Sequence, residues 1–189
     1  MRFRVILRAV LLALAGPLIL APSLAAGPGD TIVAARQASM KEMAAAARAI
    51  AEMFDGKRAY EPAAFKAAAD TLSARAGGLT GEFPQGTQGT LGAPSAAKPE
   101  IDQARPEFEA LARHIGRLAD ALAIKAGNAP PGITADMRMT GPPMDGGSLL
   151  GKRPGAAEAD PARMPAEHLL HLILQDCASC HSKFRQKQQ

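Results

Sequence analysis

The sequence has few β-branched residues and much alanine. β-Branched side chains favour strands and alanine favours helices, so this composition argues against a strand-rich fold. No grouping of residues suggests general acid–base or nucleophilic catalysis either. We therefore expect a helical protein that is not an enzyme.

The first 25 residues have the pattern of an export signal. A basic start is followed by an apolar run over residues 9–20 and by small residues over 22–26. This order predicts a secretory signal peptide, residues 1–25. An uncleaved membrane anchor is the alternative, but the run is short for a span of roughly 20 residues, and Pro17 interrupts it. We expect no membrane span after cleavage.

Clustered positive charge is missing from the rest of the chain. Arg2, Arg4 and Arg8 lie in the predicted signal, and without these three charges the formal net charge falls from +4 to +1. No basic face then remains to neutralise phosphates, so nucleic acid is not an expected partner. Residues 26–189 suit a single domain.

The chain has only two cysteines, Cys177 and Cys180. In an exported protein, two cysteines ordinarily predict a disulfide, but one that closes so short a loop adds little stability. A thioredoxin-like redox pair needs a preceding strand, which this composition does not favour. A zinc site is a further alternative because His168 and His171 lie nearby, although their spacing is unlike that of common zinc fingers.

Four segments repeat apolar residues at steps of three and four, the period of an amphipathic helix. They cover residues 30–54, 62–75, 100–125 and a last segment that starts near Pro165. Burying four such faces predicts an all-α fold, an antiparallel four-helix bundle within residues 26–189.

Several residues predict where these helices begin and end. Asp30 is an expected N-cap of the first, and Gly77-Gly78 is expected to end the second. Pro106 either kinks the third or marks its true start. Residues 128–165 hold many glycines and prolines without a sustained period, which predicts a long loop.

Cys177-Ala178-Ser179-Cys180-His181 is the most informative motif. Thiols three residues apart lie about one helical turn apart and can both bond to vinyl groups along one edge of a haem. The histidine that follows then lies under the macrocycle, where its imidazole reaches the iron. The motif predicts one covalent haem c, held by Cys177 and Cys180, with His181 as an iron ligand. An export signal agrees with this, because such haem is attached in the bacterial periplasm.

The sequence pattern alone does not identify the second axial ligand of the iron. Methionine and histidine are its usual occupants, and methionine raises the reduction potential. Met40 and Met43 both lie on the inward face of the first predicted helix. Methionines at helical spacing are commonly core residues, so either side chain can instead fill space in the bundle.

Three local motifs resemble those of the class II c-type cytochromes, the cytochrome c′ family, between about Ile32 and Arg185. Residues 36–40, Arg-Gln-Ala-Ser-Met, are similar to the family's first-helix motif, and Phe83-Pro84-Gln85-Gly86-Thr87 is similar to its Phe-Pro-x-Gly-Ser/Thr loop. Residues 177–185 resemble its C-terminal haem motif. The loop over 128–165 is longer than the usual link in that family.

The resemblance implies roles for two residues of the first helix. Met40 stands where low-spin members carry a methionine ligand, which implies a six-coordinate haem with His181 and Met40 on the iron. Arg36 is implied to pair with a haem propionate, with snorkelling to water as the alternative. Met43 is then a core residue.

The expected function is that of a periplasmic one-electron carrier that exchanges electrons with redox partner proteins. A five-coordinate cytochrome c′ that binds nitric oxide or carbon monoxide is the alternative. A third possibility is a haem-free metal-binding or metal-delivery module, which would use segments rich in histidine and methionine, including Met137, Met139, Met144 and Met164. Family members often form dimers, so a homodimer is possible by analogy.

Overall fold

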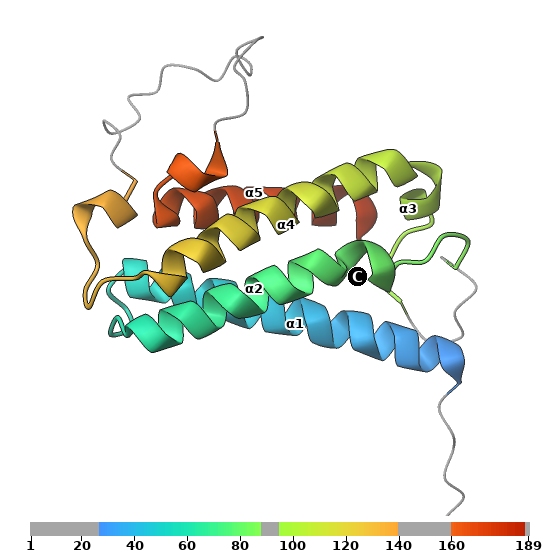
Figure 1. Ribbon diagram of the computed structural model, residues 1–189. Coiled ribbons are helices and arrows are strands. Elements are labelled where there is room, and N and C mark those ends of the chain that lie inside the picture. Colours follow the sequence, from blue (N-terminus) through green and yellow to red (C-terminus); the bar gives the residue numbers. More distant parts are fainter. Residues whose placement is uncertain (1–26, 88–94, 140–159, 188–189) are drawn as a thin grey trace, which may run out of the picture.

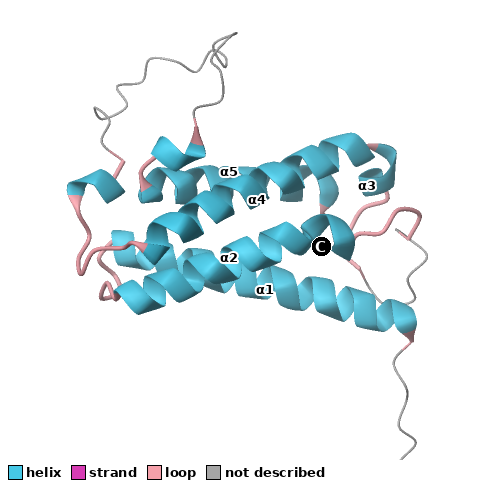
Figure 2. Ribbon diagram, in the orientation of Figure 1, coloured by secondary structure: helices cyan, strands magenta, loops and turns pink. Residues whose placement is uncertain are grey.

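Four long helices form an antiparallel bundle in the computed structural model (Figure 1). The structure describes residues 27–87, 95–139 and 160–187. The helices are α1 (Pro28–Phe54), α2 (Pro62–Glu82), α3 (Glu100–Gln103), α4 (Arg105–Gly127) and α5 (Ala166–Phe184), with short 3₁₀ helices η1 (Ala135–Met137) and η2 (Pro161–Arg163). The described residues contain no strand (Figure 2), so the predicted all-α fold is confirmed. The predicted signal peptide lies outside these residues.

Helix α1 begins two residues before the predicted N-cap. Gly27 is the N-cap, and the Asp30 carboxylate accepts a hydrogen bond from the Gly27 N–H at 3.1 Å. Asp30 therefore lies in the first turn, where a negative charge complements the positive end of the helix dipole. The helix ends at Phe54, and Gly56 then adopts a φ of +72°, which favours glycine.

Helix α2 continues past Gly77-Gly78, so the predicted end near Arg75 was wrong. A glycine within a helix costs about 1 kcal/mol relative to alanine. Ala76 and Leu79 are both buried against neighbouring helices, and this packing outweighs the cost of the two glycines. The extension to Glu82 carries the end of α2 to the end of the bundle where α5 also ends.

The third predicted helix is divided in two. Ala104 leaves the helical conformation, with φ −111° and ψ 39°, between α3 and α4. Pro106 lies in the first turn of α4, where backbone N–H groups make no hydrogen bond within the helix, so the missing N–H of proline costs nothing. It therefore marks the true start of the long helix. Within the predicted loop over 128–165, the described residues form η1 and η2.

The interior of the bundle holds two groups of buried side chains. The core cluster runs along all four long helices and includes Ile50, Phe65, Leu118, Leu122, Leu169 and Ile173. The end cluster is smaller and consists of Phe83, Ile101, Phe108 and Phe184. Its members lie where α2 and α5 end and where α3 and α4 begin. Among the helices that the structure describes, none is both long and apolar enough to cross a bilayer.

Helix α4 offers a direct test of the core. Leu118 is 0% exposed, and Ile124, six residues later on the same helix, is 69% exposed. We expect Leu118→Ala to lower the free energy of unfolding by about 2–5 kcal/mol, because it leaves a cavity among packed side chains. Ile124→Ala should change it by less than about 0.5 kcal/mol. Urea unfolding of both variants measures the difference, and equal losses would contradict this placement of α4.

Candidate functional site

The Cys-x-x-Cys-His motif lies in the last turns of α5. Cys177 and Cys180 are free thiols and half-buried, and His181 is exposed. Cys177 packs against the core cluster, whereas Cys180 packs against the end cluster. The two thiols therefore contact different clusters, although they lie about one turn apart on the same helix.

The local environment sets the protonation of these groups. Burial raises the pKa of the Cys177 thiol, with a smaller contribution from the Asp176 carboxylate. Burial also raises the pKa of Cys180 to about 11, with Cys177 and Asp176 adding to the effect. Although the His181 side chain is exposed, partial desolvation by the surrounding protein and then the positive charge of Arg185 lower the pKa of its imidazole. At neutral pH both thiols are protonated and the imidazole is neutral, the form whose nitrogen can bind a metal ion.

Met40, the iron ligand that the resemblance implies, lies on α1. Its half-buried side chain packs against both the core cluster and the end cluster. Met43, almost one turn further along α1, is 8% exposed and belongs to the core cluster. Of these two methionines, Met40 therefore packs against both clusters, whereas Met43 lies within the core cluster alone.

The packing between α1 and α5 fits a flat group held between these helices. In the ring of four long helices, α1 packs closely on α2, α2 on α4, and α4 on α5, but α1 and α5 make far fewer contacts. A macrocycle attached to α5 and reaching α1 needs these two helices to stand apart. Helix α5 carries two thiols that can bond to the vinyl groups of a haem and an imidazole that can bind its iron, and α1 carries a thioether that can bind the same iron.

Arg36 lies one turn before Met40 and is buried, with 4% of its surface exposed. Its guanidinium lies over the Phe83 ring at 4.3 Å, and its Nε donates to the Glu82 carbonyl. Nη2 lies 3.5 Å from Thr87 Oγ1. Burial lowers the pKa of Arg36, while the Glu82 and Asp102 carboxylates act in the opposite direction. The side chain does not snorkel to water, because the end of α2 holds it inside.

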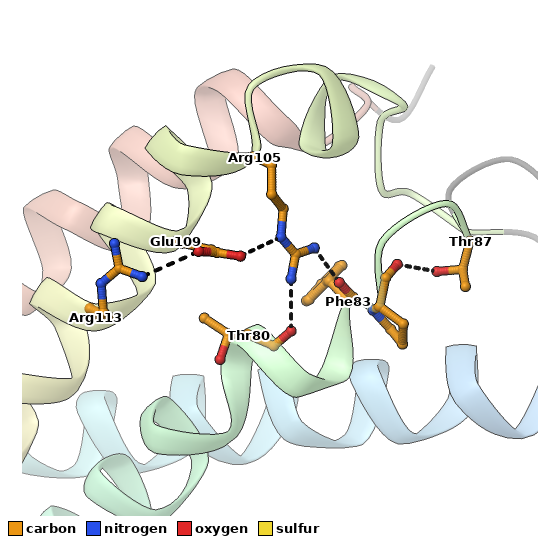
Figure 3. Close-up of polar contacts among 7 residues, drawn as sticks. Thr80, Phe83, Thr87, Arg105, Glu109 and Arg113 are labelled. Atoms are coloured by element: carbon orange, nitrogen blue, oxygen red, sulfur yellow. Dashed lines mark hydrogen bonds and ion pairs between the residues drawn. The ribbon is translucent and has the colours of Figure 1, made fainter.

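The Phe83-Pro84-Gln85-Gly86-Thr87 loop folds back on itself to present these acceptors. Gly86 has a φ of +74°, a conformation that favours glycine. Thr87 Oγ1 donates to the Pro84 carbonyl at 2.7 Å, which closes the turn (Figure 3). The glycine and the threonine of this motif therefore each serve the turn that the loop forms.

Arg105 is a residue that sequence reasoning missed. Figure 3 shows its side chain reaching from α4 to the end of α2. It donates from Nη1 to the Phe83 carbonyl and from Nη2 to the Thr80 carbonyl at 3.3 Å. The sequence contained one indication of this role, since Arg105 and Glu109 are an arginine and a glutamate four residues apart. Such pairs are common on helix surfaces, so this one did not stand out.

Three further contacts hold the part of α5 that carries the motif and the residues just after it. Residues 96–98 pair with the chain just after the motif, where the Lys98 N–H donates to the Phe184 carbonyl at 2.9 Å and the Gln186 N–H to the Ala96 carbonyl at 2.8 Å. One residue before Cys177, Asp176 Oδ2 lies 2.5 Å from His114 Nδ1 on α4. The cysteines therefore sit on a helix held at both sides of the motif.

The zinc-site alternative has no ligand set in the part of the chain that the structure describes. No group of three or more histidine, cysteine and acidic side chains there could hold a metal ion. His171 is exposed and His168 is half-buried. Of the loop methionines, Met137 is buried in the core cluster and Met139 is 44% exposed, while Met144 lies outside the described residues.

Comparison with known proteins points to one family. The family model described as Cytochrome C′ matches residues 31–141, more than half of the chain. Cytochrome c-556 of Agrobacterium fabrum is 30% identical over 106 residues, which cover 56% of this chain and 70% of that protein. The matched residues of the family model end before Cys177, so the Cys-x-x-Cys-His motif is an independent observation.

Solved structures of low sequence identity share the fold. Cytochrome c′ from Thermochromatium tepidum is 23% identical with a TM-score of 0.57, over 86% of this chain and 98% of that one. A cytochrome c′ described by an unusual ligand-controlled dimer dissociation is 21% identical with a TM-score of 0.58, over 86% and 100%. These likenesses support the four-helix bundle.

Proposed function

Because the chain belongs to the cytochrome c′ family, whose members bind covalent haem c, we propose that it is a periplasmic one-electron carrier with His181 and Met40 as the axial ligands of its haem iron. When bound, the haem supplies an iron that gains and loses one electron. The chain's own residues attach it, hold its ligands and exclude water around it.

We propose that the last turns of α5 provide the attachment and one axial ligand. Cys177 and Cys180 lie about one turn apart on a helix fixed by residues 96–98 and by His114. Both thiols hold the haem edge covalently, so the cofactor stays bound in either oxidation state. The neutral His181 imidazole follows directly and is the proximal ligand.

The observation that carries the six-coordinate proposal is the position of Met40. Its side chain packs against both clusters, and these are the clusters that Cys177 and Cys180 contact. A thioether is a soft donor that favours reduced iron and raises the reduction potential. With both ligands supplied by packed helices, little rearrangement accompanies electron transfer. The alternative is a five-coordinate, gas-binding member of the family.

Arg36 is the proposed contact for a haem propionate. Its guanidinium is buried one turn from Met40, and a charge-assisted pair there would be screened little by solvent. The same side chain already contacts Glu82, Phe83 and Thr87. A propionate would therefore share a guanidinium that is held in place before the haem arrives.

Partners follow from the proposed activity. Redox proteins would meet this chain near the exposed His181 end of α5, where electrons can pass at short range. The ligand-controlled dimer of one solved cytochrome c′ makes a homodimer the assembly to test for this chain. Light scattering with and without carbon monoxide would measure it.

The absorption spectrum of the purified protein tests the function. We expect a low-spin spectrum in both oxidation states, almost unchanged by carbon monoxide, because Met40 occupies the sixth position. A high-spin spectrum that shifts readily with carbon monoxide would favour the gas-binding alternative. A colourless protein, produced in cells with working haem maturation, would contradict both and favour the metal-delivery module.

A further inference from the structure

The carboxyl end of α2 depends on residues from two other helices. Its last turn has no basic residue, and Phe83, the residue after it, is not helical, with φ −119° and ψ 70°. The last carbonyls of a helix need donors from elsewhere. Arg36 of α1 donates to the Glu82 carbonyl, and Arg105 of α4 donates to the carbonyls of Thr80 and Phe83. These two arginines therefore supply the donors at the carboxyl end of α2 and at the start of its loop.

The Arg105 guanidinium is itself held in a fixed orientation. Its Nε lies 2.7 Å from Glu109 Oε1, and Arg113 Nη1 lies 3.3 Å from the other oxygen of Glu109 (Figure 3). Hydrogen bonds from both arginines lower the pKa of Glu109, so its carboxylate is charged at neutral pH. The Arg105 side chain is 17% exposed, compared with 59% for Arg113. Arg105 is therefore the inner member of this row, and Arg113 the outer one.

The contacts of Arg105 continue to Met40 through the end cluster. The Arg105 guanidinium lies 5.6 Å from the centre of the Phe108 ring, and that ring packs on Phe83 with centroids 5.2 Å apart. Phe83 lies under Arg36, one turn before Met40. Met40 packs against this same cluster. A displaced Phe83 would thus loosen two contacts of α1 next to the proposed iron ligand.

We infer that Arg105 is a positioning residue for the methionine side of the haem. By holding the Phe83 carbonyl, it keeps the Phe83–Thr87 loop under Arg36 and keeps the end cluster packed against Met40. This inference rests on the proposed His181 and Met40 coordination. Under this inference, how often Met40 leaves the iron depends on Arg105, a residue that contacts neither iron ligand directly.

Three variants of the haem-loaded chain test this role. Arg105→Gln removes the charge and the forked donor, Arg105→Lys keeps the charge, and Arg113→Gln removes an arginine that shares only Glu109. We expect Arg105→Gln to bind carbon monoxide about tenfold faster than the wild type, a change of about 1.4 kcal/mol, because Met40 leaves the iron more often. The rate of carbon monoxide binding to Arg105→Lys should lie between those of Arg105→Gln and the wild type. The rate for Arg113→Gln should stay within about twofold of the wild-type rate. The methionine-to-iron charge-transfer band of the ferric protein should weaken in the same order.

Hydrogen exchange of the amides in residues 36–40 and 85–87 separates this inference from the proposed coordination. If the wild type itself is high-spin, the coordination proposal fails, and exchange alone then decides the role of Arg105. Faster exchange in Arg105→Gln than in Arg113→Gln supports it. Equal exchange in the two variants overturns it, as does faster exchange without any change in carbon monoxide binding in a low-spin protein. Arg105→Lys answers the same question if Arg105→Gln fails to fold.

Discussion

Replacing both Cys177 and Cys180 by alanine is expected to abolish covalent haem attachment. These are the only two cysteines of the chain, so no other thiol can form a thioether. After denaturation, the wild-type polypeptide should stay coloured and stain for haem on a gel, whereas the double variant should be colourless. The comparison needs expression with a working haem maturation system.

Single substitutions sharpen this prediction. Cys177→Ala and Cys180→Ala should each retain one thioether and stain more weakly than the wild type. Ser179→Ala is the matched control, because Ser179 is exposed between the cysteines and its hydroxyl donates to the Gln175 carbonyl of the same helix. It should stain like the wild type. Haem staining in the double variant would contradict the proposed attachment.

Loss of haem should also lower stability. Helices α1 and α5 contact each other much less than the other neighbouring pairs, so the haem would supply the packing between them. An attached haem stays on the unfolded chain as well, but its packing between α1 and α5 and its bond to Met40 would form only in the native state and would favour that state. The double variant should therefore unfold at a lower urea concentration than Ser179→Ala.

The helices could be predicted because their signal is local and periodic. Apolar residues at steps of three and four identify the four segments. The sequence left two possibilities open for Pro106, and the structure shows that it marks the start of α4. The end of α2 could not be predicted in this way. Gly77-Gly78 reads as a stop in the sequence, yet the burial of Leu79 against other helices carries the helix on to Glu82. Tertiary packing decides such positions, and a local pattern does not contain it.

In the candidate site, too, residues that are adjacent in sequence could be predicted, and residues that only the fold brings near could not. Cys177, Cys180 and His181 are adjacent in the chain, so their chemistry is readable without a fold. Met40 lies far away in sequence, and helical spacing alone could not separate it from Met43. The resemblance to a family singled out Met40, and the packing against both clusters supports that choice.

Arg105 could not have been predicted from the sequence for a different reason. It acts on the backbone carbonyls of Thr80 and Phe83, and a carbonyl acceptor leaves no trace in residue type. Its partner Glu109 suggests an ordinary surface pair. The role becomes visible only when α4 lies beside the end of α2, which is a property of the assembled bundle.

Met40→Ala is expected to convert the low-spin haem to a high-spin, five-coordinate form. Alanine has no donor atom, so the iron loses one axial ligand while His181 and the two thioethers stay. The methionine-to-iron charge-transfer band should vanish, carbon monoxide should bind readily, and the reduction potential should fall because the thioether favours reduced iron. Absorption spectroscopy, with and without carbon monoxide, and a redox titration measure all three.

Met43→Ala is the matched control for this prediction. Met43 is 8% exposed within the core cluster, so its truncation should cost about 2–5 kcal/mol of unfolding free energy through a cavity. The spectrum of Met43→Ala should nevertheless stay low-spin, because Met43 belongs to the core cluster and does not pack against the end cluster, which Cys180 contacts. The two variants then separate ligand loss from core damage, since one changes the spectrum and the other mainly the stability. A spectral change in Met43→Ala with none in Met40→Ala would identify Met43, almost one turn further along α1, as the ligand in place of Met40. No change in either would mean that the sixth ligand comes from another part of the chain.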